Sequence, residues 1–245
     1  MPQVSVRFYA ELNDFLPEKQ QGKQLSVELD RRTSIKDMLE ALGVPHTEIM
    51  ALIVNGESVG FDYIVNAGDH ISVYPPFAEI DIHPLQKLGE YTQDEFRFVL
   101  DCHLGRLARY LRQCGFDTLY QNDFDDDQLA QISSAEQRIL LTRDRSLLKR
   151  SAIEYGYFVR ATDPRKQLDE IIQRYRLRDQ IRPFGRCTLC NGTVEPVDKQ
   201  AIDSLLEPKT RKHYDTFWQC SNCQQIYWEG SHVEKMQRVT KDLLH

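Results

Sequence analysis

Aspartates recur directly after apolar stretches in the middle of the chain. Asp101 follows FRFVL, and Asp144 follows ILLTR, and both stretches have residue types typical of strands. Parallel strands bring their carboxyl ends to one edge of a sheet, where ligands usually bind. Converging carboxylates repel one another unless a cation neutralises them, and such oxygen ligands suit Mg²⁺ or Mn²⁺. Further acids follow the two other stretches of this kind: Asp123, Asp125, Asp126, Asp127 and Asp163.

Helix capping is the alternative explanation for these acids. An aspartate after a strand commonly caps the next helix, and capping is a sufficient explanation for any one of them. The set as a whole favours a metal site, because Asp101 and Asp144 each follow a β-rich apolar run. A divalent ion there can generate a hydroxide nucleophile and stabilise both oxygens of a phosphoryl displacement.

Four of the six cysteines form two CxxC pairs, which are typical of a metal site. Two such pairs place four thiolates around a tetrahedral Zn²⁺, and a closed shell of this kind is structural. His213 and His232 are then not required as ligands. The alternative to a zinc site is a redox-active CxxC pair. In that case the presence of two CxxC pairs in the chain would be a coincidence. The predicted zinc ligands are Cys187, Cys190, Cys220 and Cys223.

Arginines accompany the acids and are candidate phosphate contacts. Arg143 and Arg145 flank Asp144, with Lys149 and Arg150 close behind. Arg145 has a second interpretation, because it could pair with Asp144 and only lower the pKa of that carboxyl. Three more recur every third residue on a predicted helix, where a solvated helix face is the equal alternative: Arg106, Arg109 and Arg112.

Strand-like and helix-like patterns alternate through residues 96–180, which predicts a parallel α/β sheet with right-handed crossovers. The residues before this region, 81–95, have no clear period and are interpreted as a linker. The alternation ends at residue 181, where the cysteine region and a polar tail that resembles a helix begin. The predicted strands are 96–101, 117–121, 138–142 and 156–161, and the predicted helices are 104–115, 126–137, 145–152 and 164–177.

Residues 1–80 show the order β-β-α-β-β, which predicts a β-grasp domain. The strands are expected at 4–12, 24–30, 51–59 (a hairpin with Asn55-Gly56 at its turn) and 69–77, and the helix at 34–43. The phrases VNGESV and GDHISVYPPF resemble the ubiquitin-like sulfur carriers. Those carriers work through a C-terminal Gly-Gly, whereas this chain continues with Ala78-Glu79-Ile80. We therefore expect a docking or structural role for this domain rather than sulfur carriage.

The bulk composition limits the classes of function. With 41% hydrophobic and 28% charged residues and no long apolar run, the chain is expected to be soluble, without a membrane span or secretory signal, and cytoplasmic. Residues 1–80 hold 6 basic and 12 acidic residues, whereas the other 165 hold 25 of each. Any nucleic-acid binding must therefore depend on local basic patches.

Several phrases together resemble the Mut7-C RNase family. They are FVLDCHLGRLARYLRQCGFDTLY, DDQLAQI, RILLTRDRSLLKR, CTLCNG and CSNCQQIYWEGSH, which occur in this order over nearly the whole chain. The resemblance implies a PIN-like α/β/α nuclease core (96–180), a four-cysteine zinc ribbon with a C-terminal tail (181–245) and, as in some bacterial members, an N-terminal ubiquitin-like domain (1–80).

The resemblance also implies metal-dependent RNA cleavage by a set of acids. Carried over to this sequence, the acids are Asp101 and Asp144, with a middle acid in the run Asp125–Asp127, where Asp126 or Asp127 opens the second helix. Asp163 is a candidate fourth acid from strand order. Mg²⁺ or Mn²⁺ would be the catalytic ion, with Arg106, Arg143 and Arg145 as phosphate contacts. Tyr227, Trp228 and His232 could stack RNA bases, although Trp228 could equally pack against the core.

The alternative function is an adaptor that binds RNA without turnover. It would use the zinc ribbon, its aromatic residues and the ubiquitin-like domain, which could itself have a protein partner. Cleavage of RNA in Mg²⁺ or Mn²⁺ separates the two functions.

Overall fold

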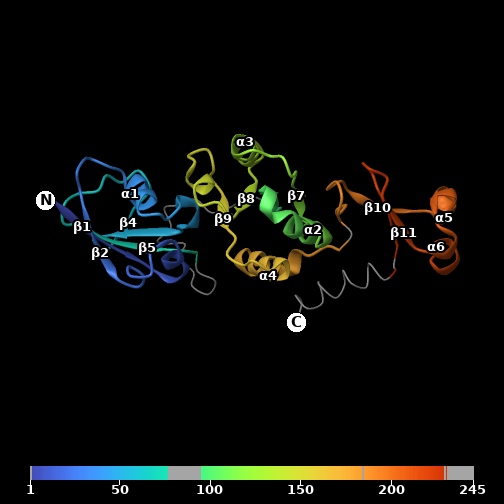
Figure 1. The fold of residues 1–245 in the computed structure, drawn as a ribbon, viewed down its shortest axis with the longest axis horizontal. Helices are drawn as coiled ribbons and strands as arrows, with labels where there is room; N and C mark the ends of the chain where they lie inside the picture. Colours follow the sequence, from blue (N-terminus) through green and yellow to red (C-terminus); the bar gives the residue numbers. More distant parts are fainter. Residues whose placement is uncertain (1, 77–94, 184, 229, 231–245) are drawn as a thin grey trace. The chain divides into compact units, whose positions relative to one another are not determined.

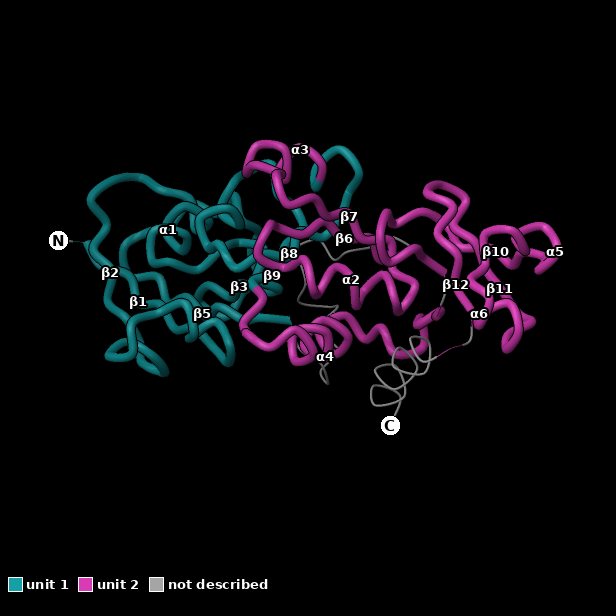
Figure 2. Tube along the Cα trace, turned by 45° about the vertical axis from the view of Figure 1, so that its right-hand side comes forward, with its two compact units in different colours: residues 1–94, 133–158 teal, residues 95–132, 159–245 magenta. Residues whose placement is uncertain are grey.

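The computed structural model describes residues 2–76, 95–183, 185–228 and 230. The chain forms two compact units (Figure 2): Met1–Asp94 with Ser133–Phe158, called unit 1, and Glu95–Ile132 with Val159–His245, called unit 2. Most of the predicted linker, Ala78-Glu79-Ile80 and the predicted helical tail lie outside the described residues. Within the part of the chain described, no helix has both the length and the apolar character needed to cross a membrane.

The first part of unit 1 is the predicted β-grasp, a five-stranded sheet in the order β2-β1-β5-β3-β4 (Figure 1). The first and last strands run parallel at its centre, and the other pairs are antiparallel. Asn55 and Gly56 both have positive φ at the predicted hairpin turn. The strands are β1 (Gln3–Phe8), β2 (Gln24–Glu28), β3 (Ala51–Val54), β4 (Glu57–Ser58) and β5 (His70–Tyr74).

Helix α1 (Ile35–Ala41) packs against the sheet. Ser34 caps it by accepting a hydrogen bond from the amide of Asp37, as its residue type predicts. Ile35, Met38 and Leu39 recur at helical spacing and are buried in one apolar cluster with side chains of β1, β3 and β5. The single turn η2 (His46–Glu48) follows the helix.

The first predicted strand, 4–12, is too long. The strand ends at Phe8, and Ala10–Phe15 form a 3₁₀ helix, η1. Ala10 has φ 46°, which breaks the extended run. The side-chain amide of Asn13 then donates to the carbonyls of Phe8 and Ala10 and holds the new turn.

The predicted α/β order continues in the rest of the chain. In unit 2, β6 (Arg97–Leu100) leads through η4 (Cys102–Leu104) into α2 (Gly105–Gln113), and β7 (Asp117–Leu119) pairs in parallel with β6. In unit 1, β8 (Ile139–Thr142) pairs in parallel with β9 (Gly156–Phe158). The predicted helices 126–137 and 164–177 are α3 (Asp126–Glu136) and α4 (Pro164–Arg174), and the predicted helix 145–152 is only the 3₁₀ turn η5 (Leu147–Lys149).

Unit 1 cuts across the predicted 96–180 core. Residues 133–158, which include β8, η5 and β9, belong to the same compact unit as the β-grasp. The reason is local, because η2 of the β-grasp contacts both η5 and β9. The domain boundaries given above stay a prediction.

The C-terminal part of unit 2 is the predicted ribbon. It has three antiparallel strands, β10 (Val194–Val197), β11 (Phe217–Cys220) and β12 (Ile226–Trp228). Its sequence did not predict the short helices between β10 and β11. These are α5 (Lys199–Ile202), η7 (Asp203–Leu205) and α6 (Pro208–His213), and Ile202 and Leu206 form a small apolar cluster with Phe217.

The apolar face of α2 provides a test of the fold. Leu111 is fully buried, whereas Arg109 on the same helix is exposed. We expect Leu111→Ala to lower the free energy of unfolding by about 2–5 kcal/mol, because a cavity is left behind. Arg109→Ala should change it by less than about 0.5 kcal/mol. Urea unfolding of both variants followed by circular dichroism measures the difference, and equal costs would contradict this packing.

Candidate metal sites

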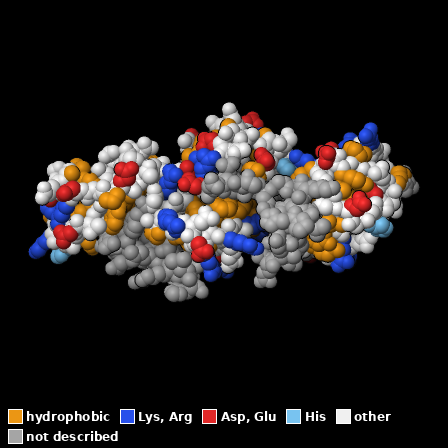
Figure 3. All heavy atoms as spheres, turned by 180° about the vertical axis from the view of Figure 1, so that it is seen from behind, with side chains coloured by type: hydrophobic (Ala, Val, Ile, Leu, Met, Phe, Trp, Pro, Cys, Tyr) orange, Lys and Arg blue, Asp and Glu red, His pale blue; other side chains and the backbone are white. Residues whose placement is uncertain are grey.

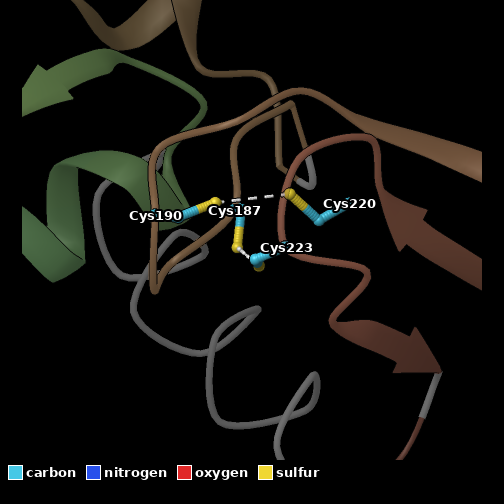
Figure 4. A group of neighbouring side chains, drawn as sticks. All are labelled: Cys187, Cys190, Cys220 and Cys223. Atoms are coloured by element: carbon cyan, nitrogen blue, oxygen red, sulfur yellow. Dashed lines mark hydrogen bonds between the residues drawn. The ribbon is translucent and has the colours of Figure 1, made fainter.

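The four predicted zinc ligands lie together in unit 2 (Figure 4). Sγ of Cys187 is 3.6 Å from Sγ of Cys223, and Sγ of Cys190 is 3.4 Å from Sγ of Cys220. All four sulfurs lie within 4.8 Å of one another. A tetrahedral zinc with Zn–S bonds of about 2.3 Å requires sulfurs roughly 3.8 Å apart. The cluster therefore fits a structural Zn²⁺.

The environment of the thiols also suits a metal. Burial opposes ionisation of Cys187, but hydrogen bonds from Tyr227 and from the amides of Leu189 and Cys190 outweigh it and lower its pKa to about 7. Burial raises the pKa of Cys223 to about 12. A metal that binds the cysteines as thiolates must displace their remaining protons.

The first knuckle, 187–190, is held against α2 by a buried arginine. Arg112 donates to the carbonyls of Thr188 and Leu189, at 3.4 and 3.0 Å, and to the carbonyl of Thr118 in β7, at 2.9 Å. Arg112 is only 6% exposed, so it does not belong to a solvated helix face. Burial lowers its pKa, and the neighbouring Cys187 and Cys190 oppose that shift.

Asn191 makes a second connection between the knuckle and β7. Its side chain accepts from the amide of Thr118 at 2.9 Å and donates to Oδ1 of Asp117 at 2.7 Å. It has φ 67°, a conformation that asparagine tolerates better than most residues. Arg186 adds an ion pair with Asp117 at 3.4 Å. The first knuckle and the first βα unit are thus bonded to each other.

The aromatic residues of the ribbon take part in its own packing. The hydroxyl of Tyr227 lies 3.1 Å from Sγ of Cys187 and accepts from the amide of Thr188. Trp228 contacts the ring of Tyr214 and packs against the cluster that contains Phe217. Both rings are half-buried, so stacking of RNA bases on them stays a prediction. His232 lies outside the described residues.

Loss of a zinc ligand should be visible in metal content. We expect Cys190→Ser and Cys223→Ser to lose stoichiometric zinc and to lower the melting temperature, because the knuckle also anchors α2 and β7. Cys102→Ser, outside the cluster, should keep its zinc. Atomic emission of protein purified without added metal, with differential scanning fluorimetry, measures both effects. Full zinc occupancy in Cys190→Ser would contradict the assignment.

Asp101, in unit 2, directly follows the strand β6 and caps the turn η4 that leads into α2. Its Oδ1 accepts from the amide of His103 at 2.8 Å, and only 6% of the residue is exposed. Two potential ligands beside it did not enter the sequence prediction. The ligand atoms of Asp101, Cys102 and His103 lie within 4.8 Å of one another, with Sγ of Cys102 3.2 Å from Nδ1 of His103. In the sequence, the adjacent residues Asp101-Cys102-His103 were the signal that could have indicated these two extra ligands.

In the acidic run 125–127, the first residue caps helix α3 and the other two begin it. Oδ1 of Asp125 accepts from the amide of Gln128 at 2.8 Å, and Oε1 of Gln128 accepts from the amide of Asp125 at 3.0 Å. This reciprocal pair is a capping box. Asp126 and Asp127 occupy the first turn of α3, as predicted. Their metal role stays a prediction.

Asp144, in unit 1, is an exposed residue of the turn after β8. Its Oδ1 accepts from the amide and the hydroxyl of Ser146, at 2.7 and 2.6 Å, and its own amide donates to Oγ1 of Thr142 at 2.9 Å. Asp144 is therefore a turn-forming residue. A carboxylate has two oxygens, so turn formation and metal binding are compatible. Asp101 and Asp144 belong to different units, and their convergence on one ion stays a prediction.

Asp163, the candidate fourth acid, is the N-cap of α4. Its Oδ1 accepts from the amides of Arg165 and Lys166, at 3.0 and 3.2 Å. The bond from Lys166 is the main cause that lowers the pKa of Asp163, and the charges of Lys166 and Arg106 add to it. Capping accounts for one carboxylate oxygen of Asp163, and its role as a fourth acid stays a prediction.

Asp163 therefore supports a pH-dependent prediction. Its pKa is lower in the folded chain, so its stabilising effect is present above the ordinary aspartate pKa and is lost as pH falls through the folded value. We expect Asp163→Ala to be less stable than the wild type at pH 7 and the difference to shrink towards pH 3. Urea unfolding at both pH values measures it, and a difference that grows on acidification would contradict capping.

The candidate phosphate contacts have different surroundings. Arg106 is exposed on α2, and Arg143 is half-buried beside Asp144. Arg145 instead donates to the backbone carbonyls of Asp14 and Phe15 in the β-grasp. On the face shown in Figure 3, basic and acidic side chains lie among one another.

Two family models match the chain. The model described as Mut7-C RNAse domain matches residues 96–240, more than half of the chain, and the model described as Mut7-C ubiquitin matches residues 1–81. None of the curated proteins matches.

Solved structures match over 31% of this chain, at low similarity. The small archaeal modifier protein 1 of H. volcanii is 20% identical, is covered in full and has a TM-score of 0.26. A second structure of SAMP1 from Haloferax volcanii is 20% identical, with 96% of that chain covered and a TM-score of 0.25. A putative molybdopterin converting factor, subunit 1, from Pyrococcus furiosus is 21% identical, is covered in full and has a TM-score of 0.25.

Proposed function

Because the chain belongs to the Mut7-C RNAse domain family, we propose that it is a metal-dependent ribonuclease that hydrolyses RNA phosphodiester bonds. The observation that carries the proposal is the position of two acids within the matched residues 96–240. Asp101 directly follows β6, and Asp144 follows β8 after one intervening residue. Carboxylates at the ends of parallel strands are well placed for a ligand site.

Asp101 and Asp144 are the proposed metal ligands, with Asp126 or Asp127 as the middle acid. Each of the first two has one carboxylate oxygen fixed by a backbone amide, from His103 and Ser146 respectively. These bonds orient the carboxylates before a metal binds. Hydrogen bonds to metal ligands commonly have this role. When bound, Mg²⁺ or Mn²⁺ supplies an activated hydroxide and stabilises the charge on the phosphate.

Manganese fits this environment better than magnesium. Cys102 and His103 lie beside Asp101, and a nitrogen or sulfur ligand disfavours Mg²⁺ relative to transition metals. The site would then require Mn²⁺ for full activity and be sensitive to softer ions.

The remaining residues would hold the substrate. Arg106 is exposed on the helix that follows Asp101, and Arg143 directly precedes Asp144, so either can pair with RNA phosphates. The zinc ribbon is structural in this proposal, because its four thiolates complete the zinc shell and its first knuckle is bonded to α2 and β7. The β-grasp would act in docking rather than in sulfur transfer.

Substitution of Asp144 tests the proposal. Asp144→Asn keeps an oxygen that can accept from Ser146, so the turn should persist. We expect its Mn²⁺-dependent cleavage of RNA to fall at least about 100-fold, since even supporting residues of metal sites cost 10–100-fold. Asp101→Asn should behave alike, and Asp30→Asn, an exposed residue of the β-grasp, should retain full activity. The measurement is cleavage of total RNA by zinc-loaded protein, with new ends read by sequencing.

The outcomes separate the two candidate functions. Wild-type activity in Asp144→Asn would contradict the site. RNA binding by gel shift with no cleavage by the wild type in Mg²⁺ or Mn²⁺ would favour the adaptor.

A further inference from the structure

The guanidinium of Arg145 is held by the β-grasp. Nη1 donates to the carbonyl of Phe15 at 3.3 Å, and Nη2 donates to the carbonyl of Asp14 at 3.0 Å. Its Cζ lies 5.0 Å from the ring centroid of Phe15 and 5.2 Å from that of Phe158, which are cation–π distances. The two rings are in edge contact with each other, 5.5 Å apart. The cation thus joins η1 to the turn after β8 and to β9.

Two more contacts hold the chain just beyond this turn. Nζ of Lys149 donates to the carbonyl of Glu40 in α1 at 2.7 Å. Nε2 of His46 in η2 donates to the carbonyl of Ile153 at 2.9 Å, while its Nδ1 lies 2.6 Å from Oε1 of Glu40. His46 is 7% exposed, so this bridge is largely shielded from water.

Glu48 holds the end of β9. Its Oε1 accepts from the amide of Phe158 at 2.6 Å, and Glu48 is 1% exposed. A buried carboxylate requires such partners, so the bond also satisfies Glu48 itself. Glycine at position 156 lets β9 lie close to Leu148 and to Thr47 of η2. A Cβ at this position would lie 2.6 Å from Cδ2 of Leu148 and 3.4 Å from Cγ2 of Thr47.

These contacts define one surface of the β-grasp, made by η1, the C-terminal end of α1 and η2. Most of the hydrogen-bonding groups on this surface are acceptors. They are the carbonyls of Asp14, Phe15 and Glu40 and the carboxylate of Glu48. The segment it contacts, residues 144–158, offers Arg145, Lys149 and the amide of Phe158 as donors. The surface and the segment are complementary in charge and hydrogen bonding.

We propose that the β-grasp domain is an intramolecular clamp for the turn that carries Asp144, and that Arg145 is a positioning residue of this clamp rather than a phosphate contact. The partner of the docking surface is the chain's own segment 144–158. The inference rests on the proposed function, because it gives the clamp the task of orienting a proposed metal ligand. Arg145 acts through the turn and does not touch the RNA.

Amide hydrogen exchange tests the clamp without any assay of activity. The turn has amides that report its opening: those of Ser146, Lys149 and Arg150 donate within the turn. In the full-length zinc-loaded protein, Arg145→Ala should speed exchange of peptides covering 143–150 by roughly tenfold, since it removes hydrogen bonds from a charged donor. Arg145→Lys should have a smaller effect. Arg31→Ala, an exposed arginine of the β-grasp, is the matched control and should have none.

Glu48 provides a second pair of variants in case Arg145→Ala does not fold. Glu48→Gln keeps an oxygen acceptor for the amide of Phe158 and should protect residues 156–158 as the wild type does. Glu48→Ala lacks the acceptor and should speed exchange there and in the turn. Equal exchange in both Glu48 variants and the wild type would overturn the clamp.

Kinetics separate positioning from phosphate binding. A positioning role predicts that Arg145→Ala raises the Mn²⁺ concentration for half-maximal cleavage severalfold, with little change in KM for RNA or in its salt dependence. Raised KM, weaker salt dependence and unchanged hydrogen exchange would identify a phosphate contact and overturn the inference. If the wild type does not cleave RNA, the proposed function fails, and the exchange result still decides whether the clamp exists.

Discussion

The turn after β8 depends on one carboxylate oxygen. Oδ1 of Asp144 accepts from both the amide and the hydroxyl of Ser146, so this residue shapes the loop in which it lies. The same carboxylate is the proposed metal ligand. The chain therefore cannot exchange Asp144 for an apolar residue without changing both the turn and the site. The contacts of Arg145 and Lys149 with the β-grasp add support from outside the turn.

The first cysteine knuckle makes comparable contacts with the first βα unit, which contains Asp101. Arg112 and Asn191 connect the knuckle to α2 and β7, close in sequence to Asp101. Asp101 thus precedes a helix that is bonded to the knuckle, and Asp144 lies in the turn that the β-grasp contacts. Such supporting contacts are what keeps catalytic groups in a productive geometry.

The sequence predicted the features that follow from local pattern. The β-grasp, the α/β order, the ribbon and the gathering of four cysteines are confirmed, because hydrophobic period, turn residues and ligand spacing are local signals. What local pattern could not predict are partners distant in sequence. Arg112 resembles its exposed neighbours Arg106 and Arg109, and only its contacts with the knuckle explain its burial. Arg145 lies about 130 positions from the carbonyls of Asp14 and Phe15 that it contacts, so no local pattern pointed to these partners.

Binding of Mn²⁺ followed by electron paramagnetic resonance tests the central claim most directly, because it requires no knowledge of the RNA. Titration of zinc-loaded wild type and of an Asp101→Asn, Asp144→Asn double variant gives the affinity of each. We expect the wild type to bind Mn²⁺ and the double variant to bind it at least about 100-fold more weakly. Equal affinity in the two proteins would contradict it.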